Sequence, residues 1–227
     1  MKSVLWAGCN FADEFFVIKN GIFKNFRKAG GINNCFIPDA KNQYLTMGGG
    51  VAKFLLSEQL SASTIDFVIG YDCSLDKFEA DWLHIPYIDA LPNLDLLKLD
   101  KEKYKVISCD FCHPKQEITS IGRIVENLQY CDVIFDNYNC PGPRYQEHLE
   151  DEQIWVLHSP IGSTVSNNGN LYRYDILKKD YIFTIGAGDH FAAAFIEARL
   201  QDYDLRQSQE LAHSKVATWL EEINEQL

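Results

Sequence analysis

The feature that most constrains this chain is a glycine-rich turn at residues 186–189, with the sequence Gly-Ala-Gly-Asp. A short β-like run at residues 181–183 precedes the turn. Behind the turn, apolar side chains recur at the spacing of one helix face, namely Phe191, Ala194, Phe195 and Ala198. The stretch therefore predicts a strand, a tight turn and an amphipathic helix in direct succession.

The same turn has the chemistry of an anion site. Gly186 and Gly188 can adopt positive φ angles and let a ligand approach the backbone closely. The first N–H groups of a helix have no partner within it, and they attract anions. Asp189 would repel an anion, so a role as general base beside a phosphate group suits it better. The alternative is a plain glycine-rich connection in which Asp189 is an ordinary acid near a helix N-terminus.

The order Gly-Ala-Gly-Asp, one residue, Phe and a helix of small residues resembles the C-terminal signature of the ribokinase-like (PfkB) carbohydrate kinases. The resemblance implies that Asp189 is the catalytic base. It also implies that Gly186, Ala187 and Gly188 form an anion hole for the transferring phosphoryl group. The expected fold is α/β, a ribokinase-like three-layer arrangement with a mostly parallel central sheet and a reduced β lid.

Composition limits the class of protein. The chain has 227 residues, of which 46% are hydrophobic and 23% charged, so we expect a single domain over residues 1–227. The net charge of −11 disfavours nucleic acid and anionic membranes as partners. No apolar run is long enough to span a bilayer. The seven cysteines lack the spacing of a disulfide framework, which favours a reducing, cytoplasmic location.

The N-terminal part resembles the opening of these kinases. A buried strand is predicted at residues 3–7, and Asn10 and Asp13 follow it at the strand end where ligands bind in α/β sheets. The resemblance implies that Asp13 contacts sugar hydroxyls, although a surface acid in a turn is the alternative. An Asn-Gly hairpin signal follows, and the resemblance places a small β lid within residues 14–47. Because such lids often meet in dimers, a homodimer is possible.

A glycine run supplies the second half of the expected acceptor site. Gly48 and Gly49 precede a helical pattern and resemble the first signature of the family, in which glycine amides and an Asn bind sugar hydroxyls. Lys53 stands in place of that Asn. An ammonium group only donates hydrogen bonds, whereas an amide donates and accepts them. Lys53 therefore selects an acidic or phosphorylated substrate, or it is simply solvated on the helix.

The middle of the chain departs from the family pattern. A strand is predicted at residues 84–88, and Pro86 within it indicates the edge of a sheet. The segment around it is too short for the usual second lid hairpin. Cys109, Cys112 and His113 match a haem-attachment spacing, which we reject because no export signal is present. A zinc or redox role for these three residues remains a minor alternative.

The expected nucleotide side lies further along the chain. Asn137 matches the first position of a motif that helps to hold Mg²⁺ and phosphate, but Cys140 replaces its Glu. Gly162 follows a strand, near where the family binds nucleotide phosphates, and a hairpin is predicted around residues 167–170. His213 resembles a residue that lines the adenine pocket, and a core or surface histidine is the equal alternative.

The leading hypothesis is an ATP-dependent phosphotransferase that phosphorylates a hydroxyl of a small sugar-like substrate. ATP and Mg²⁺ are the expected cofactors, and we assign no metal-ligating residue. The alternative is a catalytically weak relative that binds a sugar or nucleotide as a sensor or partner protein, favoured by Lys53, Cys140 and Phe183 at altered motif positions. An unrelated Rossmann-type enzyme is disfavoured, because no Gly-x-Gly-x-x-Gly turn follows the first strand.

Overall fold

The structure is a computed structural model of the whole chain. It describes the main chain of the strands within residues 4–8, 12–15, 17–18, 27–28, 37–38, 44–47 and 65–69. It describes main chain and side chains over residues 80–86, 88–90, 99, 101–111, 120–138, 150–177, 179–181, 184 and 186–225, except for the side chains of 90, 223 and 224.

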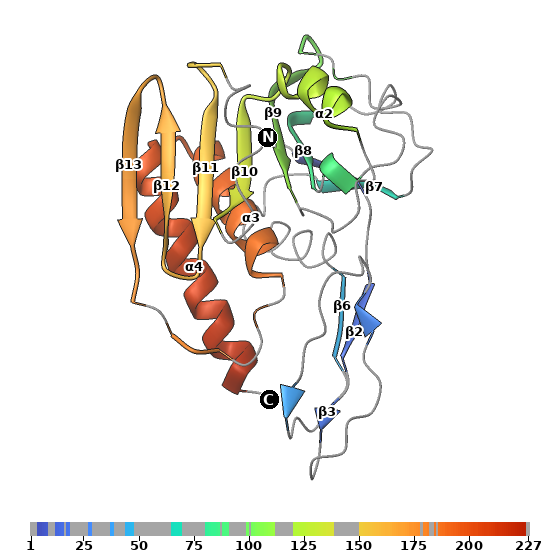
Figure 1. The fold of residues 1–227 in the computed structure, drawn as a ribbon, viewed down its shortest axis with the longest axis vertical. Helices are drawn as coiled ribbons and strands as arrows, with labels where there is room; N and C mark the ends of the chain where they lie inside the picture. The colour runs from blue at the N-terminus through green and yellow to red at the C-terminus, as the bar shows by residue number, and fades with distance from the viewer. Residues whose placement is uncertain are drawn as a thin grey trace.

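An eight-stranded sheet forms the centre of the molecule (Figure 1). In spatial order it consists of β13 (Asn170–Asp175), β12 (Gly162–Asn167), β11 (Ile154–Ser159), β10 (Val133–Asn137), β9 (Tyr104–Asp110), β8 (Ala80–Ile85), β1 (Val4–Gly8) and β7 (Ile65–Ile69). The pairs from β7 to β11 are all parallel, and β12 and β13 add antiparallel strands at one side. The mostly parallel α/β sheet predicted from the sequence is therefore confirmed.

The strand predicted at residues 84–88 is β8, which spans Ala80–Ile85, and its predicted position at a sheet edge is wrong. β8 lies between β1 and β9 in the interior of the sheet, not at an edge. The strand ends at Ile85, so Pro86 follows it in a turn. A proline placed after the last ladder residue removes no hydrogen bond from the sheet, and an interior strand tolerates it there.

The predicted hairpin around residues 167–170 is confirmed. β12 and β13 pair in an antiparallel ladder that ends at the Asn167–Asn170 pair. The two residues between them, Asn168 and Gly169, have φ angles of 50° and 72°. Positive φ at both central positions is the requirement of the tight turns that join twisted strands, and Asn-Gly meets it best.

Helices cover both faces of the sheet. Neighbouring residues of β8 point to opposite sides, since Trp82 belongs to one buried cluster and Leu83 to the other. Helix α2 (Ile121–Leu128) contributes Ile124 and Leu128 to the Leu83 cluster. Helices α3 (Ala187–Leu200) and α4 (Leu205–Glu225) contribute to the Trp82 cluster. The result is the three-layer arrangement expected from the sequence.

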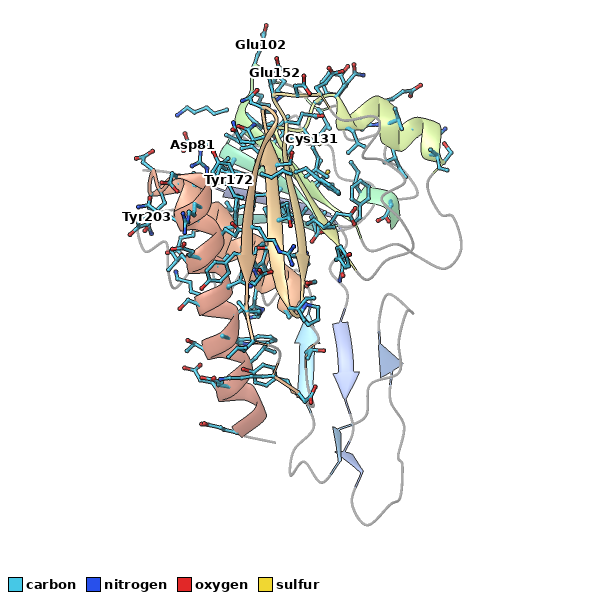
Figure 2. All side chains as sticks on the ribbon, turned by 60° about the vertical axis from the view of Figure 1, so that its left-hand side comes forward. Asp81, Glu102, Cys131, Glu152, Tyr172 and Tyr203 are labelled. Atoms are coloured by element: carbon cyan, nitrogen blue, oxygen red, sulfur yellow. The ribbon has the colours of Figure 1, made fainter. Side chains whose placement is uncertain are left out.

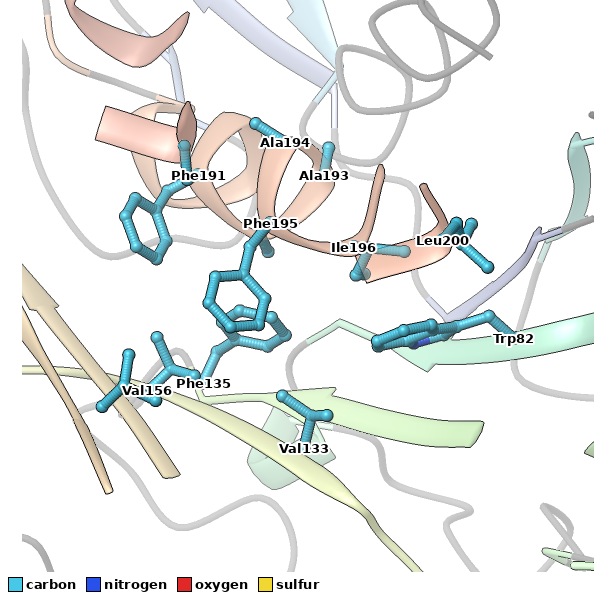
Figure 3. Packing of buried hydrophobic residues seen from close by; sticks show 13 residues of the cluster. Trp82, Val133, Phe135, Val156, Phe191, Ala193, Ala194, Phe195, Ile196 and Leu200 are labelled. Carbon is cyan, nitrogen blue, oxygen red and sulfur yellow. The ribbon is translucent and has the colours of Figure 1, made fainter. Parts of the chain in front are cut away.

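Helix α3 is more deeply buried than its amphipathic pattern predicts. Every residue from Asp189 to Ala198 is buried, not only one face. The sheet packs against one side of the helix, where Phe195 meets Phe135 edge to face at 5.6 Å between ring centroids (Figure 3). Helix α4 packs against α3 as well. A helix covered on several sides needs small residues, and the run of three alanines at 192–194 supplies them.

A polar network lies within the Trp82 side of the sheet. The indole N–H of Trp82 donates to Ser108 Oγ at 2.7 Å, and Ser108 Oγ lies 2.8 Å from Nδ1 of His84. An indole can only donate, so the hydroxyl proton of Ser108 is available for His84. Burial lowers the pKa of His84 to about 3, which keeps its ring neutral and able to accept that proton.

Smaller sheets lie within the first 47 residues. A three-stranded sheet joins β4 (Arg27–Lys28), β2 (Ala12–Phe15) and β6 (Tyr44–Met47), and a two-stranded sheet joins β3 (Val17–Ile18) and β5 (Ile37–Pro38). Figure 1 draws β2, β3 and β6 below the main sheet. The lid predicted for residues 14–47 remains a prediction, because strand pairing does not show closure.

Within the described part of the chain, no helix is both long and apolar enough to cross a membrane.

An ion pair joins α3 to α4. Lys215 Nζ pairs with Glu197 Oε2, and Gln201 donates to Glu197 Oε1 at 3.0 Å. The side chains of Lys215 and Glu197 are 25% and 4% exposed. Removing one member of a buried pair leaves an uncompensated charge, whereas apolar replacement of both is often tolerated.

We therefore expect Lys215→Met to lower the free energy of unfolding by about 2 kcal/mol, less than the about 3–5 kcal/mol of fully buried pairs. Adding Glu197→Met should restore most of this loss in urea denaturation. The control is Lys179→Met, since Lys179 and Glu221 form a more exposed pair, 60% and 46% exposed. No measurable change is expected there. An equal loss in both single variants would contradict the prediction.

Candidate functional site

The candidate site lies at the carboxyl ends of the parallel strands. Asp110 is the last residue of β9, Asn137 the last of β10 and His158 the fifth of β11. Figure 2 labels Glu102, Cys131 and Glu152 together at the opposite end, where these three strands begin. Open α/β sheets bind ligands at the carboxyl ends of their strands. The sheet thus brings the predicted Asn137 to the expected edge.

The N-terminus of α3 forms the turn predicted from the sequence. Gly186 is the N-cap residue and has a φ angle of 87°, in the left-handed region that favours glycine. The N–H of Ala187 donates to Thr184 O at 3.2 Å, so that amide is already engaged. The described residues offer no hydrogen-bond acceptor to the N–H of Gly188. Of the predicted anion-hole residues, Gly186 and Gly188 have amides without an acceptor among the described residues, and the Gly188 amide lies in the first turn of α3.

Helix α4 supports this turn from behind. The ring of His190 stacks on Trp219 with centroids 3.7 Å apart. Nδ1 of His190 lies 3.0 Å from Gly186 O, and burial lowers the pKa of His190 to about 4. A neutral ring carries one N–H, and at Nδ1 it donates to the Gly186 carbonyl. The stack therefore fixes the conformation of the turn.

Buried carboxylates gather beside the turn. Asp189 is 5% exposed, and Asp89, Asp110 and Asp136 are similarly buried. Burial raises the pKa of Asp110 well above its usual range, and the charges of Asp189, Asp136 and Asp89 add to this, while the hydrogen bond from Phe111 N–H opposes it. Asp110 and Asp189 are therefore close enough to influence each other's ionisation. Acids so placed at a strand edge are typical of functional sites.

The described acids do not form a metal-binding site. Over the described ranges, no group of three or more His, Cys, Asp or Glu side chains has a geometry that could hold an ion. Mg²⁺ is usually bound through one or two carboxylates together with water and substrate phosphates. The described residues therefore form no dedicated protein site for Mg²⁺.

The backbone at position 162 requires a glycine. Its φ angle is 137°, and a Cβ at this position would lie 2.1 Å from the carbonyl oxygen of Tyr174. Gly162 pairs with Asp175 at the start of the β12–β13 hairpin. No side chain fits there, so the hairpin requires glycine whether or not a nucleotide binds nearby.

His213 is a buried residue with its polar atom engaged. Its Nε2 lies 2.7 Å from Ser163 Oγ, and its ring stacks on Tyr174 with centroids 5.3 Å apart. Burial lowers the pKa of His213 to about 4, and the nearby His158 lowers it further. Of the alternatives that the sequence left open, the structure supports a core histidine, and a role in the adenine pocket remains a prediction.

Several predicted residues lie outside the described residues, namely Asn10, Gly48, Gly49, Lys53, Cys112, His113, Cys140 and Phe183. Asp13 lies in β2, where its backbone pairs with Thr46 and Lys28. Cys109 is buried in the core, where burial and the neighbouring Cys131 raise its pKa well above the usual range. A thiol held protonated in this way is a poor metal ligand or nucleophile.

Three residues of this region were missed by sequence reasoning. Asp136 and His158 lie near the ends of β10 and β11, and Trp219 stacks behind the turn from α4. The available signal was position, because Asp136 directly follows an apolar strand core and His158 comes two residues after Val156 of the next strand. Trp219 carried no such signal, since its spacing is equally typical of a helix face in the core.

Comparison with solved structures identifies the architecture. The nucleoside kinase of Methanocaldococcus jannaschii, an archaeal member of the ribokinase family, is 16% identical with a TM-score of 0.64, over 95% of this chain and 90% of that one. Adenosine kinase from Schistosoma mansoni, with adenosine and AMP, is 12% identical with a TM-score of 0.62, over 96% and 95%. A pyrophosphate-dependent kinase of the ribokinase family, with a pyrophosphate analogue and myo-inositol, is 14% identical with a TM-score of 0.57, over 92% of each chain.

The chain has the ribokinase fold. No protein-family model matches the sequence, and no curated protein matches it by sequence. At such low identity the likeness establishes the fold alone, and the function has to be argued from the site.

The two glycines of the turn should respond differently to alanine. Gly186→Ala forces a side chain into the left-handed region, and we expect it to lower the free energy of unfolding by about 1–2 kcal/mol. Gly188→Ala is the matched control, because its Cβ would lie 3.4 Å from His158 Cε1, an ordinary contact. It should leave stability unchanged or slightly raised in urea denaturation. A larger loss at Gly188 than at Gly186 would refute this view of the turn.

Asp110→Asn should make the protein more stable at neutral pH. The folded pKa of Asp110 lies above its usual 3.8, so between these values the folded state binds more protons than the unfolded state. The free energy of unfolding then falls as pH rises through this window, by about 1.4 kcal/mol per pH unit. Asn lacks this dependence and can still accept the 2.7 Å bond from Phe111 N–H.

The measurement is the difference in unfolding free energy between Asp110→Asn and wild type at pH 4, 6 and 8. We expect the difference to be small at pH 4 and to grow with pH. The exposed Asp151 supplies the control Asp151→Asn, for which the difference should stay flat. A pH-independent difference for Asp110→Asn would show that its pKa is not raised.

Proposed function

We propose that this protein is an ATP-dependent phosphotransferase that phosphorylates a hydroxyl group of a small sugar or sugar-like molecule. The observation that carries the proposal is the place of Asp189, a buried carboxylate in the first turn of α3, next to the Gly188 amide. A base and an anion-binding amide side by side suit transfer of a phosphoryl group to a hydroxyl. The ribokinase fold supports this reaction class.

Asp189 is the proposed general base. An acceptor hydroxyl placed against its carboxylate gives up its proton as the oxygen attacks phosphorus. Asp110 lies within electrostatic range of Asp189.

The N-terminus of α3 is the proposed anion hole. The amide N–H of Gly188 points into the region before the helix, and the helix dipole adds positive potential there. Gly186 and Ala187 shape the turn through the left-handed N-cap and the bond to Thr184. Such fixed dipoles stabilise charge that develops on the phosphoryl oxygens without reorganisation.

The N-terminal residues are the proposed acceptor side. Asn10, Asp13, Gly48 and Gly49 would bind hydroxyl groups of the acceptor, and Lys53 would bind an acidic group on it. The small β-sheets within residues 14–47 are part of the proposed lid. Closure of a lid would exclude water, and this protects phosphoryl transfer from hydrolysis.

The donor side is proposed along the β10–β12 edge. Asn137, Gly162 and His213 are the proposed nucleotide neighbours. ATP is the preferred donor because the fold is shared with nucleoside kinases. Mg²⁺ would neutralise phosphate charge and would be held mainly by phosphate oxygens and water, as the described acids form no metal site of their own.

A second function is a binding protein without turnover. One observation favours it: Nε2 of His213, a proposed neighbour of the nucleotide, is already engaged by Ser163. Such a protein would bind a sugar or a nucleotide and act as a sensor or partner. The buried Asp189 beside the Gly188 amide argues against this function, because binding alone does not need a base.

A thermal-shift screen of sugars and nucleosides with and without Mg-ATP tests the proposal first, because a ligand of the native state raises its stability. Asp189→Asn then tests the mechanism. It keeps the shape and removes the base, so we expect turnover of the identified acceptor to fall about 10²–10⁴-fold while donor affinity is retained.

Asp151→Asn is the matched control, since Asp151 is exposed on a turn. It should leave turnover unchanged. Undiminished phosphorylation by Asp189→Asn would refute the role of the base. Stabilisation by ATP without turnover of any acceptor in the panel would instead support the binding protein.

A further inference from the structure

His158 lies beneath the proposed anion hole. It is the fifth residue of β11, and its cross-strand neighbours are Asn137 on β10 and Ser163 on β12. Its ring stacks on Phe191 of α3 with centroids 5.1 Å apart and an interplanar angle of 27°. The strand and the helix thus hold the imidazole from two sides.

The imidazole meets the turn at Gly188. A Cβ built on Gly188 would lie 3.4 Å from Cε1 and 3.9 Å from Nε2 of His158. The Cε1–Nε2 edge of the ring therefore borders Gly188, whose amide belongs to the proposed anion hole.

Nε2 of His158 is an unexplained polar atom. It is buried and has no hydrogen-bond partner among the described residues. Buried polar atoms almost always have partners, and one without a partner points to a missing ligand, ion or water. By contrast, Nε2 of the neighbouring His213 is satisfied by Ser163 at 2.7 Å. Of these two histidine nitrogens, the one without a partner is that of His158, which lies beside Gly188 of the turn.

The surroundings of His158 favour a neutral imidazole that donates a hydrogen bond over a charged imidazolium. Burial lowers the pKa of His158 to about 4, and the carboxylate of Asp136 acts in the opposite direction. The ring is therefore neutral at pH 7 and offers one N–H. The charged groups that act on nearby Asp110 are all carboxylates. A phosphate entering this acidic edge needs hydrogen-bond donors close to the turn.

We propose that His158 is the side-chain member of the anion hole and donates its Nε2–H to an oxygen of the phosphoryl group held at Gly188. The ligand is a phosphate oxyanion of the phosphoryl donor. This inference rests on the proposed function and names a further binding residue for it. Phe191 and Gly188 position the ring, and the phosphate supplies the partner that Nε2 lacks.

Two substitutions separate a donor from a packing residue. His158→Phe keeps the ring and its stacking on Phe191 but has no N–H. His158→Gln loses the ring and keeps an N–H donor. If His158 binds phosphate, the Phe variant should bind pyrophosphate and ATP about tenfold to a hundredfold more weakly, and the Gln variant should stay closer to wild type. If the ring only packs, the order is reversed.

Isothermal titration with pyrophosphate and with Mg-ATP measures these affinities without any acceptor. Melting temperatures of both variants without ligand show that each is folded. A weakening for both probes in the Phe variant supports the inference. A Phe variant that binds both probes as wild type does would overturn it and leave Asp189 and the proposed kinase untouched.

Nitrogen-15 NMR of the histidine side chains gives a readout that packing does not affect. We expect pyrophosphate to shift the Nε2 signal of His158 and to leave Nε2 of His213 nearly unchanged. Binding of pyrophosphate with no shift at His158 would overturn the inference. If wild type binds neither probe, there is no anion hole at Gly188, and both this inference and the proposed kinase fall.

Discussion

The burial of α3 between the sheet and α4 is the constraint on which the rest of this structure depends. Phe195 packs on Phe135 from the sheet side, and Glu197 pairs with Lys215 of α4. A helix fixed on both sides has a fixed N-terminus, and that N-terminus carries Asp189 and the amide of Gly188. Packing along the helix therefore determines where the carboxylate of Asp189 and the helix dipole point, in agreement with the general rule that sites need rigid supporting elements.

The sequence predicted the layers of the fold but not how deeply each strand or helix is buried within them. Local rules sufficed for the β12–β13 hairpin, because Asn168-Gly169 can adopt positive φ at both turn positions. They failed for Pro86, where the strand ended three residues earlier than the predicted 84–88 and lay inside the sheet. They also failed for α3, because periodicity reports the face turned to the sheet and cannot show that a second helix covers the other faces.

The site was predictable to the extent that its residues sit in local motifs. The turn at residues 186–189 and Asn137 fell where expected, at the carboxyl edge of the sheet. The contacts of these residues were not predictable. The Ala187 amide is taken by Thr184, and Gly162 is required by the close approach of Tyr174. Those facts depend on which distant strands and helices meet, and so does the approach of His158 to Gly188. The spacing of residues within one helix or strand cannot predict which residues of other elements will contact it.

Charge balance at this edge is the strongest physical argument about what it binds. Buried acids at Asp89, Asp110, Asp136 and Asp189 oppose the entry of any anion, and the overall charge of −11 adds to this. A phosphate is therefore stable here only if fixed donors and an accompanying cation outweigh that repulsion. The α3 N-terminus supplies donors, and a phosphate-bound Mg²⁺ would supply positive charge. The same acids favour a neutral hydroxyl acceptor beside Asp189, since a neutral group enters without repulsion and, in the proposed reaction, leaves its proton on Asp189.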